Sequence, residues 1–225
     1  MGKGFFVTGT DTEIGKTTIS TGLLAALNRA GYTTAAMKPI ASGCSQAHGR
    51  LLNDDALQLM RTCSLQLNYE DINPYAFAPP IAPHIAAAQV GVSIDIRFIK
   101  NLADSLRANS DYCIVEGVGG WQVPLTETET VEDLAIALEL PVILVVGLRL
   151  GCISHALLTA NAIKHSGLRF VGWIANHCDQ YVDNGDEVIE SLKQRIEAPC
   201  IGTVGFMDEI DAELIGGKLD TARFT

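Results

Sequence analysis

The sequence predicts one α/β domain, spanning residues 1–225, in which a mostly parallel β-sheet carries helices on both faces. Three observations lead to this prediction. Short apolar runs without in–out alternation are typical of strands that are buried on both faces. Segments of helical periodicity separate these runs, as the crossovers between parallel strands require. The composition, 48% hydrophobic and only 19% charged residues, provides enough apolar surface for the core of such a domain.

Strand-like and helix-like segments alternate from the first residues onward. Residues 5–7 form a first apolar run, and the helical pattern that follows the next loop ends at Gly31. Ser154 is a plausible N-cap of a later helix. We expect further strands at 33–37, 112–115, 142–146, 170–175 and 200–204, and helices at 54–61, 94–108, 154–165 and 186–195. Residues 44–53 and the proline-rich segment 74–83 are expected to be long loops over the carboxyl edge of the sheet, where ligands bind in this fold class.

The loop after the first strand has the composition of a phosphate-binding loop. It reads Gly-Thr-Asp-Thr-Glu-Ile-Gly-Lys-Thr-Thr over residues 9–18, with a strand before it and a helix after it. Backbone N–H groups, the positive helix end and Lys16 can surround the β- and γ-phosphates of a nucleotide, and the Thr17 hydroxyl can bind Mg²⁺. Thr10 stands where the usual motif has its first glycine. We expect a P-loop NTPase-like domain that binds ATP and Mg²⁺; the alternative is an ordinary turn with a surface lysine.

Three further charged residues follow strands or begin a helix at the same predicted edge. Lys38 ends the second strand, Asp55 lies at a helix start, and Glu116 ends an apolar strand and precedes a glycine-rich segment. Taken singly, Lys38 is more readily explained as a solvated charge, and Asp55 as an acid favoured in the first turn of a helix. A carboxylate at a strand end beside the phosphate loop, however, lies where a P-loop enzyme needs a second Mg²⁺ ligand. Thr17, Asp55 and Glu116 therefore form a coherent candidate metal site.

Charge and hydropathy exclude several kinds of partner. The net charge is −10 and the sequence has no Lys/Arg cluster, so we expect neither nucleic acid nor an anionic membrane surface as a partner. The longest apolar run, residues 142–148, is far too short to span a bilayer. The amino-terminal residues do not resemble a signal peptide, and the six cysteines show no CxxC pair or zinc spacing. We therefore expect a cytoplasmic protein with reduced thiols.

Several motifs together resemble one family, over nearly the whole chain to about Gly205. In order, they are the loop at residues 8–17, Lys-Pro followed by Ala-Ser-Gly at 38–43, Asn-Pro-Tyr at 73–75 with Pro-His at 83–84, Glu-Gly-Val-Gly-Gly-Trp at 116–121, and Gly-Trp-Ile-Ala-Asn at 172–176. This series is similar to that of the dethiobiotin synthetases. The long phosphate loop with two acidic residues is that family's own form.

The resemblance implies a reaction and a set of site residues. CO₂ and 7,8-diaminononanoate (diaminopelargonate) would form a carbamate, ATP would phosphorylate it, and ring closure would release dethiobiotin, ADP and phosphate. The implied catalytic residues are Lys16 and Lys38, which neutralise charge, and Thr12 and Ser42, which hydrogen-bond the carbamate. The implied metal ligands are Thr17, Asp55 and Glu116. The implied nucleotide contacts are Glu13, Ile14, Gly15, Lys16, Thr17, Thr18, Asp55, Glu116, Gly119, Asn176 at the adenine edge and Gly205 beside the base. The family forms homodimers, and the turn at residues 151–155 would hold the substrate tail of the partner's site.

Two other kinds of enzyme or ATPase share this scaffold. An amidotransferase of the cobyrinic-acid-synthetase type would carry an added glutaminase domain, for which this chain is too short. A switch ATPase of the chromosome-partition type would have a lysine early in the loop, where this chain has Asp11, and a basic or amphipathic surface. A binding module without chemistry would not need both Lys38 and Glu116.

Overall fold

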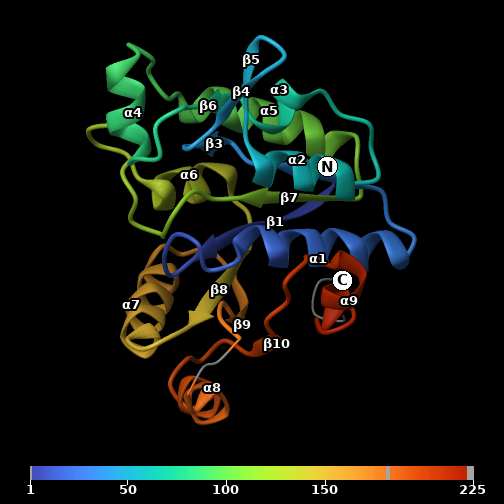
Figure 1. The fold of residues 1–225 in the computed structure, drawn as a ribbon, viewed down its shortest axis with the longest axis vertical. Coiled ribbons are helices and arrows are strands. Elements are labelled where there is room, and N and C mark those ends of the chain that lie inside the picture. Colours follow the sequence, from blue (N-terminus) through green and yellow to red (C-terminus); the bar gives the residue numbers. More distant parts are fainter. Residues whose placement is uncertain (1, 181–182, 222–225) are drawn as a thin grey trace.

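A six-stranded parallel sheet forms the centre of the computed structural model, which describes residues 2–180 and 183–221. Its strand order is β10-β9-β8-β1-β7-β2 (Figure 1). The strands are β1 (Lys3–Gly9), β2 (Thr34–Met37), β7 (Tyr112–Glu116), β8 (Val142–Leu148), β9 (Phe170–His177) and β10 (Cys200–Val204). All six lie within two residues of the expected apolar runs at each end. The predicted fold class is confirmed.

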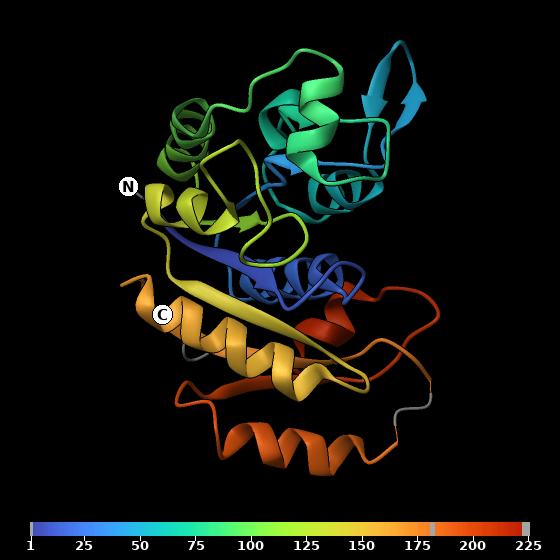
Figure 2. The same cartoon turned by 90° about the vertical axis from the view of Figure 1, so that its left-hand side faces the viewer.

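Helices cover both faces of this sheet. The helices of eight or more residues are α1 (Lys16–Arg29), α2 (Asp54–Thr62), α5 (Ile96–Ala108), α6 (Val131–Leu138), α7 (Cys152–His165) and α8 (Gly185–Lys193). Shorter ones are α3 (Tyr69–Ile72), α4 (Pro83–Gln89) and α9 (Ala212–Gly216). Helices α1, α2 and α9 pack on one face, and α5, α6, α7 and α8 pack on the other. Figure 2 shows α7 lying along strand β8.

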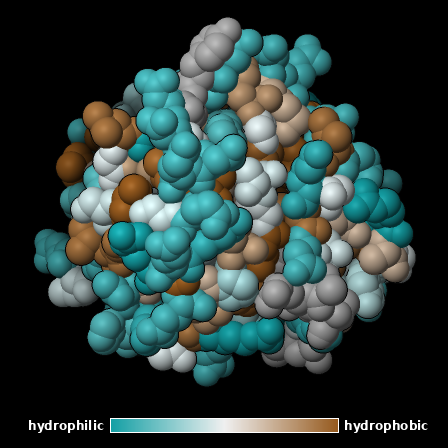
Figure 3. Space-filling view, turned by 90° about the horizontal axis from the view of Figure 1, so that it is seen from below, coloured by the Kyte–Doolittle hydropathy of each residue, from teal (hydrophilic) through white to brown (hydrophobic). Residues whose placement is uncertain are grey.

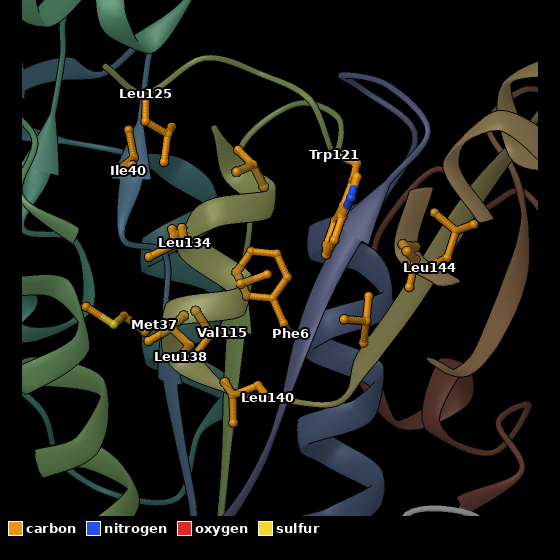
Figure 4. Close-up of a cluster of buried hydrophobic side chains, with 14 of the residues drawn as sticks. Phe6, Met37, Ile40, Val115, Trp121, Leu125, Leu134, Leu138, Leu140 and Leu144 are labelled. Carbon is orange, nitrogen blue, oxygen red and sulfur yellow. The ribbon is translucent and has the colours of Figure 1, made fainter. Parts of the chain in front are cut away.

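Alternate residues of the central strand supply the two cores, as the two-residue period of a strand requires. Phe5 and Val7 of β1 belong to the cluster under α1, whereas Phe6 belongs to the cluster on the opposite face. Figure 4 shows Phe6 beside Leu134 and Leu138 of α6, with Trp121 nearby. The Phe6 and Trp121 rings meet edge to face at 6.2 Å. Because both faces of β1 are packed, the strand holds the phosphate loop that follows it in a fixed place.

The strand register brings the candidate functional segments together at the carboxyl edge. Strand β1 pairs with β7 on one side and β8 on the other, and Val7 lies opposite Glu116. Gly9, the last residue of β1, lies opposite Val145. The loop that leaves Gly9 therefore starts between the end of β7, which carries Glu116, and the end of β8.

The two segments expected to be loops contain regular structure, so these predictions were wrong. Residues 44–53 form an antiparallel hairpin of β4 (Ser45–Ala47) and β5 (Arg50–Leu52). Its turn residues His48 and Gly49 both have positive φ, which is the geometry of a tight two-residue hairpin turn. In the segment 74–83, β6 (Tyr75–Ala76) pairs with β3 (Ile40–Ala41) in a small parallel ladder, and Pro83 starts α4. Pro83 takes the first helical position, where the missing N–H costs nothing.

The expected N-cap at Ser154 was also wrong. Helix α7 begins at Cys152, and Gly151, with φ 91°, is its N-cap. Ser154 lies in the first turn, and its side chain is exposed. Glycine is favoured at a capping position with positive φ because it has no Cβ to clash, which explains why the chain turns there and not three residues later.

The outer surface is mostly polar. On the face seen from below in Figure 1, hydrophobic residues occur in separate groups among hydrophilic ones, and one group lies on the left, the side of α7 (Figure 3). Within the described ranges, the helices are all too short or too polar to cross a membrane.

Candidate active site

The phosphate loop joins β1 to α1 through a backbone that only glycine permits at one point. Gly15 has φ 84° and is the N-cap of α1. A Cβ on Gly15 would lie 2.1 Å from Nδ2 of Asn176, so any side chain there would displace the asparagine. No acidic residue occupies the first turn of α1, and no side chain caps it. The N–H groups of this helix end are therefore oriented for an external anion.

A cavity of about 830 Å³ opens beside this loop. It brings together most of the residues predicted from the sequence, which come from β1–α1, the end of β2, α2 and the end of β7. The predicted residues that line it are Thr12, Glu13, Gly15, Lys16, Thr17, Thr18, Lys38, Ser42, Asp55, Glu116 and Gly119. The walls also include residues 80–82, from the segment before α4, Pro83 at the start of α4, and Leu52 of the hairpin. The two segments with wrongly predicted structure thus do lie over this edge of the sheet.

A second, smaller cavity of about 200 Å³ adjoins the first. Asn176 and Gly205, both predicted to lie near a nucleotide base, line it together with Phe206 and Cys178. Glu13, Gly15, Thr18 and Ile210 line both cavities. Ile14 lines neither; its side chain is buried, and its carbonyl accepts a hydrogen bond from Asn176 Nδ2 at 3.0 Å. Through this hydrogen bond, Asn176 at the end of β9 holds the backbone of the phosphate loop at Ile14.

Four predicted residues form one charged cluster in the wall of the large cavity. The ammonium of Lys38 lies 2.5 Å from Glu116 Oε1 and 2.9 Å from Asp55 Oδ2. The Thr17 hydroxyl donates to the same Glu116 oxygen at 2.8 Å. Glu116 is fully buried and Lys38 is 4% exposed. Burial alone would lower the pKa of Lys38, but the two carboxylates hold it well above its ordinary value.

Lys16 enters the same cavity with different neighbours. Its ammonium donates to the backbone carbonyl of Asp11 at 2.6 Å. Burial lowers the pKa of Lys16 to about 8, and the positive charge of Lys38 contributes to the decrease. For Asp55, burial alone would raise the pKa, but Lys38, the Thr17 hydroxyl and Lys16 together lower it below its ordinary value.

The donor set suits a small hard cation. Glu116 Oε2 is buried and has no hydrogen-bond partner among the described residues, so one charged oxygen remains available to a ligand. Two carboxylates and a hydroxyl lie at this point, whereas the described part of the chain has no cluster of three or more His, Cys, Asp or Glu. Mg²⁺ is commonly held in this manner, by one or two carboxylates together with water and the phosphates of a nucleotide.

Two contributions to the site were not assigned from the sequence. Asn73 donates through Nδ2 to the backbone carbonyl of Lys38 at 2.7 Å and so fixes the backbone at the end of β2. Arg149, just after β8, forms a salt bridge through Nη2 with the Asp11 carboxylate in the phosphate loop. The Asn-Pro-Tyr motif was a signal for Asn73. The pairing of Arg149 with Asp11, 138 residues apart, left no signal in the sequence.

Comparison with known proteins identifies the family. A family model described as "AAA domain" matches residues 3–213. The chain is 51% identical over 217 residues to the ATP-dependent dethiobiotin synthetase BioD of Pseudomonas aeruginosa (strain LESB58), covering 96% of this chain and 95% of that one. It is 47% identical over 218 residues to the protein of the same name from Cellvibrio japonicus (strain Ueda107), covering 97% and 96%. This chain belongs to the dethiobiotin synthetase family. The resemblance inferred from the motifs is confirmed.

Solved structures of similar fold come from more distant proteins. The septum site-determining protein MinD complexed with Mg-ADP, from Pyrococcus horikoshii OT3, matches with a TM-score of 0.59 at 14% identity, over 99% of this chain and 89% of that one. A ParA family ATPase from Chlorobium tepidum TLS matches with a TM-score of 0.58 at 12% identity, over 100% and 93%. At these identities the likeness concerns the P-loop fold alone. The choice between a dethiobiotin synthetase and a partition-type ATPase follows from the sequence relatives.

Proposed function

We propose that this chain is an ATP- and Mg²⁺-dependent dethiobiotin synthetase, a cyclo-ligase of biotin biosynthesis. It would join CO₂ to 7,8-diaminononanoate and close the ureido ring of dethiobiotin, with release of ADP and phosphate. The observation that carries the proposal is the large cavity, in which a phosphate loop and a second buried lysine share one wall with unpaired polar groups. The names of the relatives, which are about half identical over nearly the whole chain, supply the substrate.

The chemistry needs positive charge at two successive points. One amine of the substrate attacks CO₂ and gives a carbamate, whose oxygen then attacks the γ-phosphorus of ATP while ADP leaves. The second amine attacks the carbonyl carbon of the resulting mixed anhydride, and phosphate leaves. Lys16 would stabilise the charge on the transferring phosphoryl group, and Lys38 that on both phosphoryl group and carbamate. Charge stabilisation by preorganised groups is the main catalytic contribution in phosphoryl transfer.

Hydroxyl groups would orient the carbamate. The Oγ of Ser42 is buried and has no hydrogen-bond partner among the described residues, although Ser42 lines the cavity. A buried hydroxyl without a partner is costly, and a carbamate oxygen would satisfy it. Thr12, in the phosphate loop, lines the same cavity and would provide a second donor. Holding the carbamate in line with the γ-phosphate makes the transfer effectively unimolecular.

Thr17, Asp55 and Glu116 would hold the Mg²⁺, in agreement with the unpartnered Oε2 of Glu116. The metal would supply charge neutralisation at the phosphates. The smaller cavity would take the base, with Asn176 and Gly205 in its wall. Its connection to the large cavity through Glu13, Gly15 and Thr18 would give the nucleotide one continuous path from base to γ-phosphate.

The active enzyme would be a homodimer in which the turn at residues 151–155 completes the partner's site. This turn lines neither cavity of its own chain. Leu150, just before the turn, is fully exposed, and Leu158 of α7 is 68% exposed. A second copy of the chain would bury both apolar side chains.

The decisive experiment measures the product. The protein is incubated with 7,8-diaminononanoate, bicarbonate, ATP and Mg²⁺, and dethiobiotin is quantified by mass spectrometry. Lys16→Ala should lower kcat by more than about a hundredfold because the lysine faces charge that grows in the transition state. Lys164→Ala is the matched control, since Lys164 forms an exposed salt bridge with Glu197 and lines neither cavity. Absence of dethiobiotin from the folded wild type, or full turnover of Lys16→Ala, would refute the proposal.

A further inference from the structure

The ammonium of Lys38 occupies the centre of the candidate metal site. It contacts Glu116 Oε1 and Asp55 Oδ2, and Thr17 donates its hydroxyl to the same Glu116 oxygen. These are the three residues whose oxygens suit a divalent cation. Lys16, the other buried lysine of the cavity, instead donates to a backbone carbonyl. Lys38 is thus the one lysine, in the described part of the chain, that neutralises both carboxylates directly.

A metal ion cannot simply be added to this arrangement. The charges of Lys38, Asp55 and Glu116 leave the cluster with one net negative charge, shared by two carboxylates that are already hydrogen-bonded. A divalent cation bound to the same oxygens would lie within a few ångströms of the ammonium, in a wall where the burial of Glu116 weakens solvent screening. Glu116 Oε2 has no hydrogen-bond partner among the described residues, but a metal that also takes Glu116 Oε1 or Asp55 Oδ2 competes with the ammonium for those two oxygens.

The backbone of Lys38 is fixed, so only its side chain can yield. The Lys38 N–H donates to the Ile72 carbonyl at 2.8 Å, and the Lys38 carbonyl accepts from Asn73 at 2.7 Å. The flexible four-carbon stem can move the ammonium away from the carboxylates while the strand stays in place. Nucleotide phosphates in the same cavity would offer the ammonium a new anionic partner.

We propose that Lys38 is the internal counter-cation of the metal site in the ligand-free chain, so that a divalent metal binds weakly alone and enters together with the nucleotide phosphates that draw Lys38 away. The proposal rests on the metal site of the proposed function. It assigns Lys38 a second role besides charge neutralisation in catalysis: it makes metal binding depend on nucleotide binding. When the metal replaces the Lys38 ammonium at the carboxylates, the ammonium would move to the nucleotide phosphates.

Metal binding without nucleotide tests the proposal. Mn²⁺ is titrated into the nucleotide-free protein, and free Mn²⁺ is followed by electron paramagnetic resonance. Lys38→Met keeps an unbranched side chain, one atom shorter, and removes the charge, which leaves two buried or half-buried carboxylates uncompensated. We expect Lys38→Met to bind one Mn²⁺ at least about tenfold more tightly than the wild type does. Lys38→Gln should also increase the affinity for Mn²⁺, and it serves as a second variant if Lys38→Met does not fold.

Lys16→Met is the matched control because it removes a buried lysine from the same cavity without freeing a carboxylate. Its gain in Mn²⁺ affinity should be clearly smaller than that of Lys38→Met. The double variant Lys38→Met/Glu116→Gln should lose the gain, since the amide lacks the charge that a hard cation prefers. In the wild type, a non-hydrolysable ATP analogue should restore tight Mn²⁺ binding.

Two outcomes would overturn the proposal. One is a wild type that already binds Mn²⁺ with micromolar affinity in the absence of nucleotide. The other is an equal gain in Mn²⁺ affinity in Lys38→Met and Lys16→Met. That result would mean that any loss of positive charge from the cavity strengthens metal binding, without direct competition for the carboxylate oxygens. None of these titrations uses the diamine substrate or turnover. A failure of the proposed reaction would therefore be seen in the product assay alone, and a failure of this inference in the metal titrations alone.

Discussion

At the scale of single residues, the two buried lysines of the cavity have opposite electrostatic surroundings. Lys38 faces two carboxylates and has a raised pKa, whereas Lys16 faces a carbonyl and has a pKa of about 8. The burial of Lys16 opposes its charge, and the carboxylates of Glu116, Asp55 and Asp11 act on it too weakly to compensate. Lys16 is therefore partly neutral near pH 8 until an anion arrives.

Nucleotide binding should be coupled to proton uptake by Lys16. At pH 8 roughly half of the Lys16 side chains are neutral in the ligand-free chain, and phosphate charge favours the protonated form. Binding of Mg-ATP should then take up a fraction of a proton, which becomes small at pH 6.5 where Lys16 is already charged. Above pH 8 affinity should fall, because the bound state retains a proton that the free state has lost. Calorimetry in buffers of different ionisation enthalpy measures this uptake.

The control is Lys16→Met, in which the uptake at pH 8 should disappear even where weak binding persists. An uptake that is unchanged in Lys16→Met would assign the proton to another group and refute the prediction.

The sequence located the functional residues but not their pairing. Thr17, Lys38, Asp55 and Glu116 were each predicted from their position at a strand end or helix start, and they meet in one wall of the cavity. The ion pairs of Lys38 depend on side-chain paths across α2 and β7, which no local pattern determines. Asn73 illustrates the same limit, because its hydrogen bond to the Lys38 carbonyl joins residues 35 positions apart.

At the scale of the elements, one salt bridge connects the phosphate loop with the segment between β8 and α7. Arg149 contacts one carboxylate oxygen of Asp11, whose other oxygen accepts the Thr12 N–H at 2.8 Å. The Asp11 carbonyl accepts from Lys16. Because both side chains of the salt bridge are 44% exposed, it should stabilise the fold by no more than about 1 kcal/mol. Its larger effect should be to orient Asp11, Thr12 and Lys16.

A double-mutant cycle should reveal this orienting role. Arg149→Met and Asp11→Asn should each raise the KM for ATP by about threefold to tenfold, and the double variant should be no worse than either single one. Melting temperatures should change little. Arg29→Met removes an exposed salt bridge to Glu213, far from the loop in the sequence, and should leave the KM unchanged. Effects of Arg149→Met and Asp11→Asn that simply multiply would show that Arg149 acts on another group.

The elements that were not predicted from the sequence have weak or unusual sequence signals. Helix α6 is short, but Thr130 and Asp133 form a capping box that could have located it. The β4–β5 hairpin lacks apolar alternation, and its turn uses His48 where Asn or Asp is more common, so only Gly49 hinted at it. The buried parallel strands were found because burial on both faces gives them a continuous apolar sequence.

At the scale of the whole molecule, the chain has more positive charge at its site than its composition suggests. The net charge is −10, yet two buried lysines and a helix N-terminus line one cavity. Composition argues against a basic binding surface but carries no information about this local field. The strand order of the parallel sheet, which puts β1 beside β7 and β8, is what concentrates the charges.

If the proposed dimer forms, each active site should contain residues of both subunits. Ser154 is exposed in the first turn of α7 and lines neither cavity of its own chain, whereas Lys38 lines the large cavity. If the turn completes the partner's site, each site of a two-fold dimer uses Lys38 of one subunit and Ser154 of the other. Lys38→Ala should abolish the chemistry, and Ser154→Trp should block the substrate tail.

Mixing these two inactive variants should restore activity. After equal subunit exchange about half of the dimers are mixed, and one of the two sites in each mixed dimer has neither substitution. Turnover should therefore recover to roughly a quarter of the wild-type value. Size-exclusion chromatography must show that Ser154→Trp still forms dimers, and tagged subunits must show that exchange has occurred. If both conditions hold and no dethiobiotin forms, Lys38 and Ser154 do not contribute to shared sites, and each chain's cavity must work without the partner's turn.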